Sequence, residues 1–363
     1  MTSGTRPGVL AVLLAAVLAA CVTTPARAPL EPSATLAEFN ARRLHELLPG
    51  LPPPSVGWDR SQWLAAALRL NPRLAEQRAV VQAAAAAERT AAQHANPSME
   101  LFAEYLTSAA HSTAWLYGLS LDFLLRRPGE RARARETTAL QTALAQSDLG
   151  ESLWQVRAAL RQALLEAACA HDQTALLQAL IVERQGLLDT DRARAQLGDI
   201  ASTQTLADEL QLARAQQRQQ QSRARRADAV ARLAAAVGVP VAALDAVPLR
   251  WDDWAAIGTL QISTPDRWRT EALIARPQII DALREYDLAE IGLQNELARR
   301  WPQAHITPAY AWGGGGVREA ALTDIASDSA VGASFELPLL NQHQGPIGEA
   351  VARRAAAGEH LKA

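Results

Sequence analysis

Asn96–Leu125 reads NPSMELFAEYLTSAAHSTAWLYGLSLDFLL, and this segment predicts two β-strands inside an otherwise helical chain. In Trp115–Leu125 large apolar residues occupy every second position as far as Phe123, which is typical of a strand with one apolar face. From Gly118 on, the positions between them are small or polar: Gly118, Ser120 and Asp122. Trp115 and Tyr117, near one end, suit an interfacial aromatic girdle.

The preceding segment, Met99–Leu106, predicts the partner strand. Its apolar residues alternate with Glu100 and Glu104, and Phe102 is the exception to the pattern. The short polar segment Thr107–Thr113 joins the two strands as a hairpin. Each strand is close to the ~9–11 residues that a tilted strand needs to cross a bilayer. We therefore predict a strand pair over residues 97–125.

The same arrangement recurs further along the chain. Three residues have counterparts at an offset of 205, namely Pro72, Pro97 and Tyr105 with Pro277, Pro302 and Tyr310. The segment Gly118–Asp122 likewise matches Gly332–Glu336. Two copies of one unusual arrangement indicate an internal repeat. We predict repeat 1 over residues 61–265 and repeat 2 over residues 266–363, with a second strand pair at 302–340.

The composition favours long helices over compact globular cores. The 363 residues are 49% hydrophobic but only 5% aromatic, and the net charge is −2. The basic run Arg223–Arg226 lies inside a helical pattern, so no nucleic-acid partner is expected. No histidine or cysteine cluster has metal-ligand spacing and no nucleophile motif is present, so neither an enzyme, a cofactor nor a metal centre is expected. Cys169 is predicted to be a small core residue.

The N-terminus predicts export. Residues 1–20 combine Arg6, an apolar run and a small-residue end, which is typical of a signal peptide. The sequence Leu18–Cys21 resembles a bacterial lipobox, in which Cys21 becomes the lipid-modified mature N-terminus, although a chance cysteine is the alternative. Residues 21–60 are rich in proline and are interpreted as a lipid-anchored, extended lead-in without a folded unit.

A long helical hairpin is predicted over residues 128–238. No Pro or Gly pair interrupts the pattern from Pro128 to Gly198, and at 1.5 Å per residue such a helix would be on the order of 100 Å long. Its apolar residues follow heptad steps, which indicates a coiled-coil seam: Leu149, Leu153, Val156, Leu160, Ala163, Ala167, Ala170, Leu177, Ile181 and Leu188. Leu197, Gly198, Asp199 and Ile200 form the turn. Residues 239–265 form a short mixed segment.

Repeat 2 begins with a helix and continues with the second strand pair. Pro308 lies inside the third strand, where proline is unfavourable for a closed ladder. Gly345-Pro346 then starts another helix that is cut off at Ala363.

The order of these elements resembles the TolC-like outer-membrane efflux protein family. The stretches that carry the resemblance are Ala67–Pro72, Ala95–Pro97, Gly198–Ile200, Ala275–Pro277 and Leu337–Asn341 followed by Gly345. The implied fold is mainly α with a membrane β-barrel portion. A long coiled-coil hairpin forms an α-barrel, and four transmembrane strands per chain contribute to a trimeric twelve-stranded barrel. Physics supports an oligomer, because four strands cannot close a barrel and open edges in lipid leave backbone groups unpaired.

The resemblance implies a function as well. The chain would be the outer-membrane channel of a tripartite efflux or type I secretion system, exporting small molecules, metal ions or drugs. Its partners would be outer-membrane lipid, a periplasmic adaptor and an inner-membrane pump, with the turn at Leu197–Ile200 docking onto the adaptor. The polar strand face would line the barrel lumen: Glu100, Glu104, Ser120, Asp122, Ser334 and Glu336.

Two alternatives remain open from the sequence. Family members continue through a second long hairpin, so a non-functional truncated efflux protein is one of them. The other is a periplasmic lipoprotein with a structural coiled coil, such as an adaptor or scaffold, in which the alternating segments form a soluble β-domain.

Overall fold

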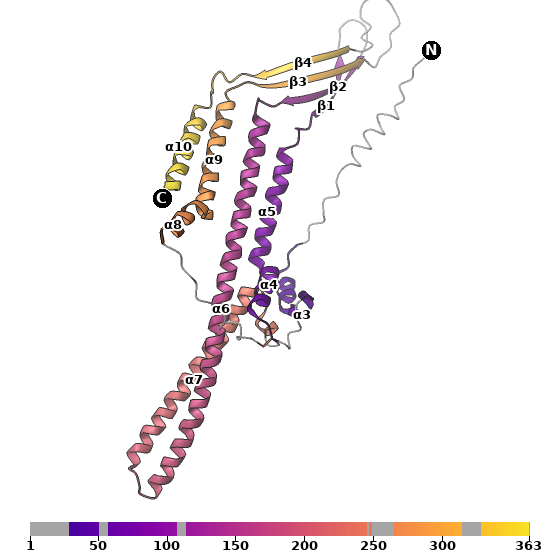
Figure 1. Cartoon of the computed structure of the whole chain (residues 1–363). Coiled ribbons are helices and arrows are strands. Elements are labelled where there is room, and N and C mark those ends of the chain that lie inside the picture. Colours follow the sequence, from indigo (N-terminus) through magenta and orange to yellow (C-terminus); the bar gives the residue numbers. More distant parts are fainter. Residues whose placement is uncertain are drawn as a thin grey trace, which may run out of the picture.

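The computed structural model describes residues 29–50, 57–106, 114–244, 247–248, 265–313 and 328–362. The molecule is elongated: a small sheet lies at one end, a two-helix hairpin reaches to the other end, and shorter helices lie between them (Figure 1). Among the described residues helices dominate and four strands are present, so the predicted mainly helical class with four strands per chain is confirmed.

The described elements form two successive runs, each with helices, a strand pair and a further helix in that order. The first copy contains α4 (Arg60–Leu70), α5 (Pro72–Ala91), β1 (Ser98–Leu106), β2 (Ala114–Leu125), α6 (Glu130–Gln196), α7 (Ser202–Val237) and the 3₁₀ helix η2 (Val241–Ala243). The second copy contains α8 (Pro265–Ala275), α9 (Pro277–Ala298), β3 (Gln303–Gly313), β4 (Asp328–Glu336) and α10 (Gln344–Lys362). Helix α5 packs against α6, and α9 packs against α10. Helix α6 also contacts α9, so the two copies lie side by side (Figure 1).

The four strands form one antiparallel sheet in the order β1-β2-β3-β4. The hairpin register pairs Glu100 with Ser120 and Ser98 with Asp122. Strand β3 runs through Pro308, which pairs with Val331 of β4. On the other side, the β2–β3 pairing is interrupted next to Pro308, because proline has no N–H to donate to the ladder.

Phe102, the exception to the alternation in the first strand, has a structural explanation. It pairs directly with Gly118 of β2, and its ring covers that glycine so closely that a Cβ there would lie 2.1 Å from the Phe102 Cζ atom. The ring thus fills the space that Gly118 leaves empty, a device known to stabilise glycines in sheets. The aromatic residue on the polar face is therefore a packing feature of the hairpin.

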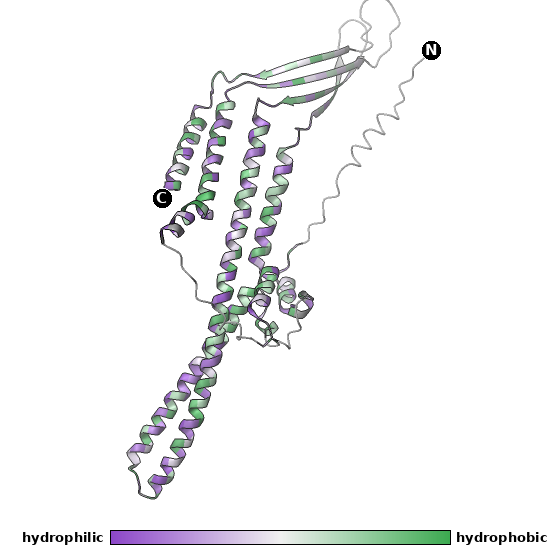
Figure 2. Ribbon diagram, viewed as in Figure 1, coloured by the Kyte–Doolittle hydropathy of each residue, from purple (hydrophilic) through white to green (hydrophobic). Residues whose placement is uncertain are grey.

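Helices α6 and α7 form the predicted long hairpin. Helix α6 has 67 residues, which corresponds to a length of about 100 Å. The predicted seam is buried at several of its positions, including Val156, Leu160, Ala163 and Leu188. Thr174, a polar residue in the same register, shares a 3.0 Å hydrogen bond with Ser222 of α7. In Figure 2 hydrophilic and hydrophobic residues are interspersed along both helices.

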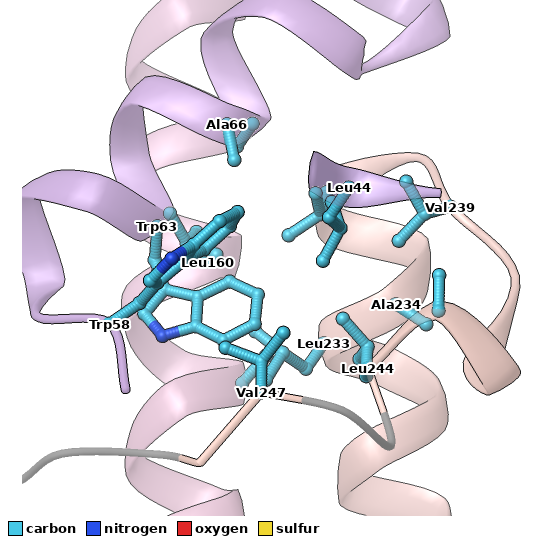
Figure 3. Close-up of a cluster of buried hydrophobic side chains, with 14 of the residues drawn as sticks. Leu44, Trp58, Trp63, Ala66, Leu160, Leu233, Ala234, Val239, Leu244 and Val247 are labelled. Atoms are coloured by element: carbon cyan, nitrogen blue, oxygen red, sulfur yellow. The ribbon is translucent and has the colours of Figure 1, made fainter. Parts of the chain in front are cut away.

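The hydrophobic core lies where α4, α6 and the end of α7 meet (Figure 3). Trp58 and Trp63 are 1% exposed and pack edge to face, with their ring centroids 5.1 Å apart. Two helices from the proline-rich lead-in are also present, α2 (Pro32–Ala41) and α3 (Leu44–Leu47). Leu44 and Leu48 of this segment are buried in the core. The interpretation of residues 21–60 as an extended lead-in is therefore wrong for this part, because two leucines gain burial there.

The junction between α4 and α5 explains the Asn-Pro motif at Asn71. The Asn71 side chain accepts from the Arg73 backbone N–H at 3.0 Å, capping α5. Its amide also donates to the Ala236 carbonyl near the end of α7, at 2.8 Å. Gly238 directly follows the last residue of α7 and has a φ of 88°. A Cβ on it would lie 2.6 Å from the Leu70 carbonyl oxygen at the end of α4. This close approach fixes the end of the hairpin against the base of α5.

One further prediction is settled at this level. Cys169 is exposed in the chain, so its assignment to the core is wrong; it borders an open groove between α6 and α7, next to Ala170 and Ala229. Over the described residues, no helix combines the length and the apolar character that a membrane crossing requires.

Candidate functional site

The sheet register places the predicted lumen residues on one face. Glu100 pairs with Ser120, Ser334 pairs with His305, and Glu336 pairs with Gln303, and cross-strand partners share a face. Asp122 lies two residues beyond Ser120, on the same side of β2. Glu104 lies four residues after Glu100 in β1 and therefore on the same face of the strand, where it pairs with Leu116 of β2.

Five of these residues line one open hollow of about 630 Å³ on the sheet. They are Glu100, Ser120, Asp122, Ser334 and Glu336. Asp122 is the best-connected of them. Its carboxylate lies 2.9 Å from the His305 Nδ1 atom and accepts from the Thr307 hydroxyl at 3.2 Å. These side-chain contacts join β2 and β3 at the position where Pro308 interrupts the backbone ladder.

Sequence reasoning missed three residues of this polar face, Ser98, His305 and Thr307, which all line the hollow. A usable signal was present. His305 and Thr307 alternate with Ile306 and Pro308, and so follow the same period of two as the neighbouring strands. The face is acidic and hydroxyl-rich, so it favours water and cations over anions.

The opposite face is apolar and exposed in the single chain. Its large residues include Met99, Leu101, Phe123, Ile306, Tyr310, Val331 and Phe335, each of them 38–78% exposed. Three aromatic residues gather on it near the end of the sheet that lies away from the helices. The Trp312 ring stacks on Tyr117 at 6.2 Å and on Tyr310 at 5.9 Å. An exposed apolar face of this extent indicates that another phase or another protein covers it.

The turn at Leu197–Ile200 lies at the end of the hairpin farthest from the sheet (Figure 1). Gly198 has a φ of 80°, a left-handed conformation that suits glycine. The Asp199 N–H donates to the Arg194 carbonyl at 3.0 Å and the Gly198 N–H to the Ala195 carbonyl at 3.1 Å, which is the Schellman pattern of a helix end. Leu197 is 79% exposed. The turn thus presents an apolar side chain that none of the described residues covers.

An ion pair stiffens the hairpin close to this turn. Arg192 of α6 binds Glu209 of α7 at 2.7 Å. Farther from the tip, Arg232 of α7 binds Glu166 of α6 at 2.9 Å. These pairs are half-exposed and individually weak, and each of them links α6 to α7.

Other predicted features lie elsewhere. The signal peptide at 1–20 and the anchor Cys21 fall outside the described residues. Across the part of the chain that the structure describes, no group of three or more histidine, cysteine or acidic side chains could hold a metal ion.

No family model matches the chain, and no curated protein matches it. Solved structures do. The outer-membrane channel OprN superposes with a TM-score of 0.67 at 20% identity, over 94% of this chain and 78% of that one. CusC, described for its transmembrane channel formation, superposes with a TM-score of 0.67 at 12% identity, over 94% of this chain and 79% of CusC. The outer membrane protein VceC from Vibrio cholerae superposes with a TM-score of 0.63 at 16% identity, over 86% of this chain and 78% of VceC. The chain therefore has the fold of these outer-membrane channel proteins, and the predicted TolC-like fold is confirmed.

Proposed function

We propose that this chain is the outer-membrane channel component of a tripartite efflux or type I secretion system. Three copies would place their sheets in the outer membrane as one twelve-stranded barrel and their hairpins in the periplasm. Small molecules, metal ions or drugs would pass through the shared lumen. An adaptor and an inner-membrane pump would deliver them.

The observation that carries this proposal is the difference between the two faces of the sheet. One face presents Ser120, Asp122 and Ser334, and the other presents Leu121 and Phe335. A barrel wall needs this division, because lipid covers the outside and water fills the inside. A soluble β-domain, as in the alternative lipoprotein, would require protein to cover the apolar face. Among the described residues nothing does, since Val331 is 78% and Phe335 is 61% exposed.

The strand order supports an assembly of several chains. Strands β1 and β4 are the outer strands of the described sheet. Within lipid, both edges need partners, since unpaired backbone groups cost several kcal/mol each. Neighbouring copies supply these partners if β4 of one chain pairs with β1 of the next. Three copies give twelve strands, an even number as barrels of this kind have.

The positions of two tryptophans fit the thickness of a bilayer. Trp301 lies just before β3 and Trp312 near the far end of that strand. Eleven residues of strand extend about 36 Å. With the usual tilt of 35–45°, they rise roughly 26–30 Å, which is close to the hydrocarbon thickness of about 30 Å.

The hairpin supports the proposed contact with an adaptor. A 67-residue helix places its far end about 100 Å from the sheet. The exposed Leu197, with Gly198, Asp199 and Ile200, would then meet the adaptor deep in the periplasm. Cys21 would hold the mature N-terminus to the membrane through a lipid.

Ion conduction tests this proposal directly. Purified protein in a planar bilayer should give stable single-channel currents with a preference for cations. The double variant Glu100→Gln/Glu336→Gln should lower that preference, because both carboxylates lie on the proposed lumen face. Glu349→Gln, on α10, removes an exposed carboxylate outside the sheet and serves as the matched control. An oligomer that inserts but conducts no ions would refute the proposal.

A further inference from the structure

Among the residues of the four described strands, His305 is the only histidine. Its side chain is 34% exposed and lines the polar hollow on the sheet. Three carboxylates line the same hollow, those of Glu100 on β1, Asp122 on β2 and Glu336 on β4. No arginine or lysine of the described part of the chain lines it. The hollow is therefore negatively charged while the imidazole ring is neutral.

The contact with Asp122 decides which ring nitrogen of His305 can take up a proton. The Nδ1 atom lies 2.9 Å from a carboxylate oxygen of Asp122. An ionised carboxylate only accepts hydrogen bonds, so Nδ1 carries the hydrogen that joins the two groups. In the neutral ring the basic nitrogen is then Nε2. A proton added at Nε2 turns the ring into an imidazolium, and the pair of His305 and Asp122 then has no net charge.

The other charged groups around His305 come from the neighbouring strands and from the end of the sheet. Ser334 of β4 pairs with His305, and Glu336 lies two residues farther along on the same face. Arg127 and Arg299 border the neighbouring hollow, which shares only Glu336 with this one. Histidine ordinarily changes its charge between about pH 5.5 and 8, whereas carboxylates and guanidinium groups keep theirs. His305 is thus the group of this hollow that responds to pH in that range.

We propose that His305 makes the cation preference of the channel depend on pH. This inference rests on the proposed function, which puts the hollow on the water-filled inner face of the barrel. Above neutral pH each copy presents three carboxylates beside a neutral ring, and cations gather along this wall. In acid the imidazolium offsets one of these charges in each copy, so the local excess of cations falls. His305 sets charge selectivity through the proton on Nε2.

Reversal potentials of the full chain in a planar bilayer test this inference. A gradient of potassium chloride at low ionic strength, where fixed charges are least screened, gives the ratio of potassium to chloride permeability. The ratio is measured at about pH 8 and at about pH 5.5. It should fall by about two-fold on acidification, because one of the negative charges in each hollow is offset.

Two variants of His305 should lock the channel in opposite states. His305→Gln cannot be protonated but keeps an N–H that can donate to Asp122, so the permeability ratio should stay high at both pH values. His305→Arg carries a permanent positive charge, so the ratio should be low at both pH values. His360→Gln is the matched control, because His360 also faces a carboxylate, with 3.5 Å between its Nδ1 atom and Glu285, but lies on α10 outside the sheet. It should leave the fall on acidification unchanged.

The outcomes separate failure of this inference from failure of the proposed function. A wild-type ratio that is the same at both pH values overturns the inference, and so does a fall in His305→Gln as large as in the wild type. A channel that conducts but has no cation preference at about pH 8 also overturns it, while channel function stands. If the wild-type protein inserts and conducts no ions, the proposed function itself fails.

Discussion

An arginine placed on either of two adjacent residues of β2 should distinguish lipid from water on the two faces of the sheet. Leu121 lies about midway between Tyr117, in the aromatic cluster, and the end of β2, so it is close to the expected bilayer midplane. A charge on the lipid face at that depth costs about 2–4 kcal/mol per chain, a factor of about 30–900 in the folding equilibrium. Ser120→Arg, one residue away on the lumen face, should cost much less, since water and nearby carboxylates surround it.

The assay is guanidinium unfolding of the protein in lipid vesicles, followed by tryptophan fluorescence. Leu121→Arg should lower the unfolding midpoint strongly and Ser120→Arg only slightly. The pair Phe335→Arg and Ser334→Arg repeats the comparison in β4, where the two residues also lie on opposite faces. If both members of each pair lower the midpoint equally, the assignment of the faces to lipid and water is refuted.

Three further predictions concern other parts of the chain. In the same unfolding assay, Gly238→Ala should destabilise the fold by more than the roughly 1–2 kcal/mol that a left-handed alanine costs, because its Cβ meets the end of α4. Gly198→Ala, which has open space around it, should cost only those roughly 1–2 kcal/mol. Cys21→Ser should abolish incorporation of a fatty-acid probe, and persistent labelling would contradict the lipid anchor. Asp199→Cys should crosslink to the adaptor in cells while Gln217→Cys, exposed on α7, should not, and the reverse result would refute docking at the tip.

The strands and the hairpin could be predicted because their patterns are local. The alternation in Trp115–Leu125 reports its two faces directly, and an uninterrupted run to Gly198 requires a long helix. The rule that every second residue of a strand points to the same side also predicted that Glu100, Ser120 and Ser334 share a face, and in the sheet they lie on one side.

What the sequence did not reveal depends on contacts between distant segments. The contact between Asp122 and His305 joins residues 183 positions apart, and no local pattern predicts it. Phe102 broke the alternation because its partner across the hairpin is Gly118, which becomes visible only with the register.

The lead-in was misinterpreted for a related reason. Proline-rich composition favours extended chain, but Pro32 occupies the first turn of α2, where proline is compatible with a helix. Leu44 and Leu48 then add to a core built mainly from residues more than a hundred positions away. Burial of this kind depends on the tertiary structure, which composition does not report.

If three copies of this chain close one barrel in the outer membrane, the mass and the location of the native assembly must show it. Membranes from cells that make the protein are separated by density, extracted with detergent, and examined by size-exclusion chromatography with light scattering. The protein should be in the outer-membrane fraction, should need detergent for its release, and should have a protein mass equal to three chains. A monomer that washes from the membrane with salt alone would contradict the claim.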